Sequence, residues 1–163
     1  MPAAWALHDT EEVVMVPRWV RAHLPELRKR FRPVPQGGVA GPESADAREF
    51  APAVDAMAVV VAAAAADGHR TGGRCAVHQT ALNAFGLHGL VHLAQAAAMR
   101  GCTPGSLTTP LVVLPFTVWA RGRLRRSGVL RPTRPRDLAQ GLAFAAAAAV
   151  ATHAPAQGVR HRR

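Results

Sequence analysis

Residues 77–99 read VHQTALNAFGLHGLVHLAQAAAM, and this stretch decides the fold class. Apolar side chains such as Leu82, Phe85 and Leu90 recur around much of the helical circumference. A helix that is apolar on most sides usually packs among other helices. We therefore expect a central, buried helix over this stretch, ended by Gly101.

A second helix is expected over residues 45–66, because this stretch is rich in Ala, the residue with the highest helix propensity. Its core-facing residues, at helical spacing, would be Phe50, Val54, Met57 and Val61. Residues 33–43 before it and residues 68–74 after it contain several Pro or Gly residues. Both segments are therefore predicted to be loops.

Residues 10–32 form a basic amphipathic segment. Apolar side chains from Trp19 to Phe31 recur at helical spacing, and Arg and Lys occupy the opposite positions. Pro25 should kink this helix or start a second one. The apolar run that Pro17 ends, residues 13–16, is compatible with either a short strand or a first helical turn.

Residues 111–120 are strongly apolar but are interrupted by Pro115, so a strand and a broken helix both remain open. A loop with Pro and Arg follows over residues 127–136. Asp137 would then cap a last Ala-rich helix over about residues 138–153.

Together these patterns predict a mostly α fold: a single small domain of four or five helices, joined by Pro/Gly-rich and Arg-rich loops. A short strand near residues 12–16 and another near 111–118 are the open alternatives. The expected parts are a basic amphipathic N-terminal segment (1–32), a Pro/Gly linker (33–43), a helical core domain (44–154) and a basic tail (155–163).

The composition is that of one intracellular domain. The chain has 163 residues, 49% of them apolar, which is enough to bury a core. Two cysteines are too few for a disulfide scaffold, and no apolar run reaches the roughly 18 residues of a membrane span. We see no signal peptide and expect a cytoplasmic protein, or a host-nuclear one if the sequence is viral. The lack of Ile and Tyr indicates a GC-rich bacterial or viral genome.

The net charge of +10 is unevenly distributed. Residues 1–80 carry nine basic and nine acidic side chains, whereas residues 81–163 carry eleven basic side chains and one acidic one. All the excess positive charge therefore lies in the second half. Such asymmetry indicates a polyanionic partner or an anionic membrane surface.

Seven arginines and no acidic residue lie between Arg121 and Arg136. Arg binds phosphate oxygens bidentately, and the neighbouring Trp119 offers a surface for base stacking. The sequence therefore predicts a small non-enzymatic nucleic-acid-binding protein, regulatory or accessory, with little sequence specificity. The predicted contacts are Arg121, Arg123, Arg125, Arg126, Arg131, Arg134 and Arg136, assisted by Arg28, Lys29, Arg30 and Arg32.

Two other classes of protein fit the same pattern. The arginines could dock an acidic protein partner, which would make the chain an adaptor. In a small multi-span membrane protein they would form a positive loop between two apolar stretches. Catalysis is not expected, because carboxylates are nearly absent after residue 80 and Ser106 is not in a nucleophile elbow.

Histidines and cysteines of the central region could bind zinc. His88 and His92 are four residues apart, so they share one face of the predicted helix. The candidate ligands are Cys75, His78, His88, His92 and Cys102. Their spacing matches no standard zinc finger, and the cysteines could equally be small buried side chains. We expect no cofactor, with zinc as the alternative.

Overall fold

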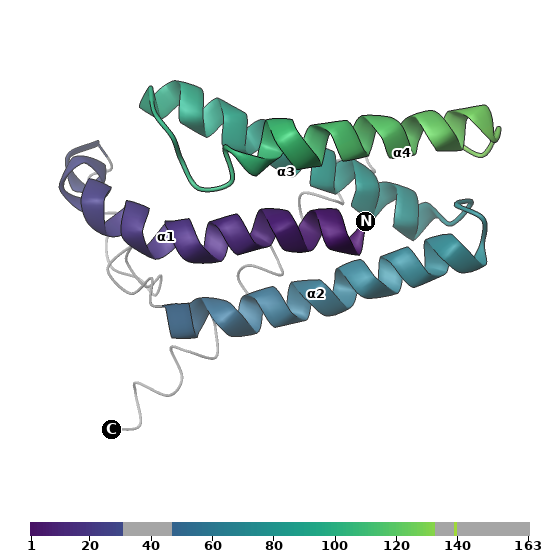
Figure 1. The fold of residues 1–163 in the computed structure, drawn as a ribbon, viewed down its shortest axis with the longest axis horizontal. Helices are drawn as coiled ribbons and strands as arrows, with labels where there is room; N and C mark the ends of the chain where they lie inside the picture. The colour runs from purple at the N-terminus through teal and green to yellow at the C-terminus, as the bar shows by residue number, and fades with distance from the viewer. Residues whose placement is uncertain (31–46, 133–138, 140–163) are drawn as a thin grey trace.

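The computed structural model describes residues 1–30, 47–132 and 139, and this part of the chain is almost entirely helical. Its elements are α1 (Pro2–Arg30), α2 (Ala47–Arg70), α3 (Ala76–Met99), the π-helical turn η2 (Thr109–Val113) and α4 (Leu114–Arg126). In Figure 1, α1 runs alongside α2, α4 lies on the other side of α1, and α3 starts beside the end of α2 and crosses towards α4. The prediction of a small, mostly α domain is confirmed.

Neither of the two stretches for which a strand was an alternative forms a strand. Residues 13–16 lie inside α1, which continues through Pro17 and Pro25 as one helix of 29 residues. Residues 109–126 form η2 and then α4, with Pro115 in the first turn of α4. The helical path is not interrupted there, because η2 runs directly into α4 and the N–H of Leu114 bonds to the carbonyl oxygen of Thr109. The strand alternatives at 12–16 and 111–118 are therefore wrong.

The apolar core is small and is centred on α3. Ala4 of α1, Phe85 of α3 and Val113 of η2 are buried against one another. The partly buried side chains that pack around them are Trp5, Val112 and Phe116. The N-terminal segment therefore belongs to the helix bundle, because its first turn supplies part of the core.

Helix α1 is also tied to the loop that joins α3 to η2. The indole Nε1 of Trp19 donates a hydrogen bond to the carbonyl oxygen of Cys102 at 3.0 Å. About two turns of α1 earlier in the chain, the carboxylate of Glu11 accepts hydrogen bonds from the backbone N–H groups of Leu107 and Thr108. These bonds fix how α1 is rotated against α3, and therefore which side chains of the two helices meet.

Three predicted parts lie wholly or almost wholly outside the described residues: the 33–43 linker, the 138–153 helix and the 155–163 tail. Among the helices that the structure does describe, none combines the length and the hydropathy needed to cross a membrane.

Candidate metal centre

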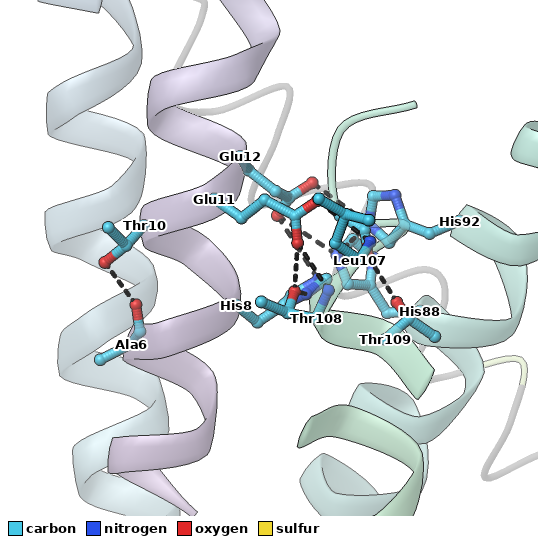
Figure 2. Close-up of polar contacts among 11 residues, drawn as sticks. Ala6, His8, Thr10, Glu11, Glu12, His88, His92, Leu107, Thr108 and Thr109 are labelled. Atoms are coloured by element: carbon cyan, nitrogen blue, oxygen red, sulfur yellow. Dashed lines mark hydrogen bonds and ion pairs between the residues drawn. The ribbon is translucent and has the colours of Figure 1, made fainter. Parts of the chain in front are cut away.

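Two pairs of side chains meet where α1 passes α3 (Figure 2). His8 and Glu12 are one turn apart on α1, and His88 and His92 are one turn apart on α3, so each pair shares one helix face. One ligand atom from each of the four residues lies within 4.8 Å of the other three. We call these four residues the His–Glu cluster.

The distances inside the His–Glu cluster are short. Nε2 of His92 lies 3.1 Å from Oε1 of Glu12, and Nε2 of His88 lies 3.5 Å from Oε2. The two Nε2 atoms of His88 and His92 are 2.9 Å apart. Nε2 of His8 lies 3.8 Å from Oε2 of Glu12. Three imidazole nitrogens and one carboxylate therefore converge on a single point.

The cluster is closed towards the core and open on one side. His8 is only 1% exposed and His92 is also buried, whereas the side chain of His88 is 48% exposed. The side chain of Glu12 is 14% exposed. The cluster is therefore accessible to solvent on the side of His88.

Two ring nitrogens in the cluster are buried without a hydrogen-bond partner: Nε2 of His8 and Nδ1 of His92. The 3.8 Å from His8 Nε2 to Glu12 is too long for a hydrogen bond. A buried polar atom without a partner costs about 1–3 kcal/mol, so a native protein rarely keeps one without a reason. For His8 Nε2, the reason would be a partner that is not a side chain.

The environment favours the metal-binding protonation states of His8 and Glu12. Burial lowers the pKa of His8 to about 4, so this imidazole is neutral at pH 7. Burial is also the largest effect on Glu12 and raises its pKa. Hydrogen bonds and charge interactions with His88 and His92 together outweigh it, so the pKa of Glu12 lies below its usual value. Neutral imidazoles and an ionised carboxylate are the forms that coordinate a metal.

A further carboxyl group, that of Asp9, lies beside the cluster without joining it. Burial and the neighbouring negative charge of Glu12 raise the pKa of Asp9 to about 6. The α1 side of the site is therefore rich in negative charge, which a bound cation would offset.

The sequence-predicted metal ligands are only partly brought together. His88 and His92 meet in the His–Glu cluster, but the other three candidates lie elsewhere. Sγ of Cys75 donates to Oδ2 of Asp67 at 3.1 Å, and Nδ1 of His78 lies 3.2 Å from the carbonyl oxygen of Ala64. Cys102 is exposed. None of these three belongs to the His–Glu cluster.

Sequence reasoning missed His8 and Glu12. The pattern that could have found them is His-x3-Glu, because its spacing of four residues places both side chains on one face of a helix. It repeats the spacing of His88 and His92. The amphipathic segment expected from the sequence begins at residue 10, so His8 lies outside it and is not predicted to share a helix face with Glu12.

The predicted nucleic-acid contacts fall into three groups. Arg123, Arg125, Arg126 and Arg131 are exposed at or just after the end of α4, while Arg121 is partly buried and donates to Oδ1 of Asn83. Arg28, Lys29 and Arg30 lie in the last turn of α1. Arg32, Arg134 and Arg136 lie outside the described residues.

The fold and the cluster define a small helical protein with three histidines and one glutamate gathered between its first and third helices. The chain belongs to a family described as proteins of unknown function with an HXXEE motif, and the family model matches residues 1–120. His8, Glu11 and Glu12 have the spacing of that motif. No curated protein and no solved structure matches the chain.

Proposed function

We propose that the protein binds one divalent transition-metal ion, represented by Zn²⁺, through Nε2 of His8, His88 and His92 and the carboxylate of Glu12. The observation that carries this proposal is the convergence of the four side chains on one point. The buried, unpartnered Nε2 of His8 faces that same point. A cation there would give this nitrogen a partner and offset the buried charge of Glu12.

The separation of the two α3 histidine nitrogens suits a metal ion. Imidazole nitrogens bind Zn²⁺ at about 2.0–2.1 Å. Two nitrogens on one ion are then about 2.9 Å apart at a right angle and about 3.4 Å apart at the tetrahedral angle. The His88 and His92 nitrogens are 2.9 Å apart. A set of three imidazoles and one carboxylate also favours Zn²⁺ and similar ions over Mg²⁺ or Ca²⁺, which prefer oxygen ligands only.

Zinc titration of the chelator-treated full chain tests this proposal. Wild-type protein should bind one Zn²⁺ per chain, and His92→Ala should weaken binding by more than ~100-fold, because removing even an outer-shell partner typically costs ~10- to 100-fold. His69→Ala is the matched control, because His69 is exposed on α2 and outside the cluster. Binding below one equivalent, or equal loss in both variants, would contradict the proposed site.

We propose phosphate-backbone binding as a second function, supported by the exposed end of α4. The guanidinium of Arg123 lies over the ring of Trp119, 5.6 Å from its centroid, and Trp119 is 56% exposed. Arg125 and Arg126 follow in the same turn and are also exposed. Three arginines beside an exposed aromatic ring are typical of surfaces that neutralise phosphates and stack bases.

Fluorescence anisotropy of a labelled random duplex over a range of salt concentrations tests this second function. Changing Arg123, Arg125 and Arg126 together to Gln should reduce the slope of log affinity against log salt by up to about 2.7, or about 0.9 for each phosphate contact. Arg121 is left unchanged because it bonds Asn83. The control changes Arg18, Arg21 and Arg70, which are exposed on α1 and α2. Identical slopes for the two triple variants would count against the α4 surface.

A further inference from the structure

We infer that Glu11, the first glutamate of the HXXEE motif, is a positioning residue: through Thr108 it fixes the tautomer of His8 that presents a bare Nε2 to the His–Glu cluster. This inference rests on the proposed metal site and assigns the motif's two glutamates different roles. Glu12 would bind the ion, whereas Glu11 would orient a ligand (Figure 2).

Glu11 is the acceptor in all three hydrogen bonds that it makes to the loop between α3 and η2. Its Oε1 accepts from the N–H of Leu107 at 3.1 Å, and its Oε2 accepts from the N–H of Thr108 at 2.7 Å. Oε2 also lies 2.5 Å from Oγ1 of Thr108. An ionised carboxylate has no proton to give, so the hydroxyl of Thr108 must be the donor in this contact.

The role of Thr108 then determines the proton on His8. Nδ1 of His8 lies 2.8 Å from Oγ1 of Thr108. The single hydroxyl proton is already donated to Glu11, so Oγ1 can only accept, and Nδ1 must carry the proton that it accepts. A neutral imidazole has one ring proton, so Nε2 carries no proton and presents a lone pair. With this tautomer Nε2 has no proton to donate, which agrees with its lack of a hydrogen-bond partner beside the Glu12 carboxylate.

Helix geometry explains why two adjacent glutamates are needed. Glu12 is four residues after His8 and lies on the same face, so it reaches the cluster. Glu11 is three residues after His8 and is rotated about 100° from Glu12, because an α-helix has 3.6 residues per turn. That rotation directs Glu11 to the N–H groups of the loop. Such outer-shell partners fix the tautomer and direction of a histidine ligand.

The tautomer of His8 can be read directly in the metal-free full chain from the ¹⁵N shifts and long-range ¹H–¹⁵N couplings of its ring. Wild-type protein should show Nδ1 protonated and Nε2 bare. Thr108→Val keeps the side-chain shape but removes the acceptor, so the proton should shift towards Nε2, where Glu12 can accept it. Thr108→Ser keeps the hydroxyl and should retain the wild-type tautomer. Circular dichroism confirms that both variants keep their helix content.

Zinc affinity supplies the second readout. Thr108→Val and Glu11→Gln should each raise the Kd for Zn²⁺ by ~10- to 100-fold, while Thr108→Ser should stay close to wild type. With Co²⁺ as the probe at saturation, the absorption bands of Glu11→Gln should match those of wild type, because the ligands are the same. A changed Co²⁺ spectrum would make Glu11 a ligand and would overturn its positioning role.

The two proposals fail separately. A wild-type protein with the proton on Nε2, or a Thr108→Val variant with unchanged tautomer and unchanged Kd, overturns the inference about Glu11. A wild-type protein that has the Nδ1–H tautomer but binds neither Zn²⁺ nor Co²⁺ contradicts the metal site, while the contact chain from Glu11 to His8 is confirmed.

Discussion

Gly105 is the residue that leaves room for the ring of His92. Its φ of +78° is a backbone conformation that side chains rarely adopt. A Cβ built at this position would lie 2.7 Å from Nδ1 of His92. Since His92 is buried, its ring can give way only by turning out of the cluster. A single hydrogen atom in place of a side chain therefore keeps one proposed ligand, His92, in position.

Substitution at this glycine should damage both stability and the site. We expect Gly105→Ala to lower the free energy of unfolding by about 1–2 kcal/mol for the left-handed backbone and by about 1–3 kcal/mol more for the overlap with His92. Gly128→Ala is the matched control, because Gly128 has a φ of +67° but no neighbour within 4 Å of its built Cβ. Urea unfolding of the two variants gives the difference. Equal losses would mean that the His92 ring moves aside at no cost.

At the scale of elements, α3 approaches η2 and α4 closely because it carries glycine at the contacts. A Cβ at Gly89 would lie 2.9 Å from Cγ1 of Val113 and 3.1 Å from Cγ2 of Thr109, both fully buried. A Cβ at Gly86 would lie 2.8 Å from Cγ2 of Thr117. This close approach sets the position of the α3 turn that carries the histidine pair.

The close approach predicts opposite effects on stability for two Gly→Ala substitutions. Gly89→Ala should destabilise the protein by about 1–3 kcal/mol, because the overlap with the core outweighs the roughly 1 kcal/mol of helix propensity that Ala gains over Gly. Gly122→Ala in α4 meets only the end of Arg126, at 3.6 Å, so it should stabilise the protein by up to about 1 kcal/mol. Chemical denaturation measures both. Stabilisation by both changes would show that α3 can move away from η2.

The same elements show what the sequence could predict. The α3 helix was predictable, within one residue at its start, because its apolar pattern is local. The spacing of His88 and His92 is local as well, and it marked half of the site. The sequence could not predict that His8 and Glu12 meet this histidine pair, because long-range packing determines which face of α1 contacts α3. Contacts from Trp19 and Glu11 to the 101–108 loop establish that orientation, and no periodicity within α1 encodes them.

At the scale of the whole molecule, the proposed ion would join α1 to α3, two helices far apart in the chain. Helix α1 contributes only Ala4 and His8 to the buried residues of the described structure. An ion that binds the folded state alone adds about 2.7 kcal/mol at a free concentration of 100 Kd. Most of that stabilisation should therefore appear as tighter closure of α1 on α3.

Hydrogen exchange followed by mass spectrometry measures that closure. At 100 Kd of free Zn²⁺, amides of α1 that exchange when it detaches from α3 should exchange up to ~100-fold more slowly. The segment at the end of α4 is an internal control for local opening, because buried Gln79 holds it without the cluster. Its Nε2 donates to the carbonyl oxygens of Gly73 and Val129, and its Oε1 accepts from the N–H of Arg131.

Zinc should slow exchange in this control segment far less than in α1. In His8→Ala, zinc should no longer affect the two segments differently. Equal slowing of both segments would show that α1 separates only when the whole bundle unfolds, and that the ion stabilises the molecule as a single unit. Slowing of α1 that persists in His8→Ala would place the zinc outside the His–Glu cluster. The exchange pattern therefore reports where the ion acts, independently of how tightly it binds.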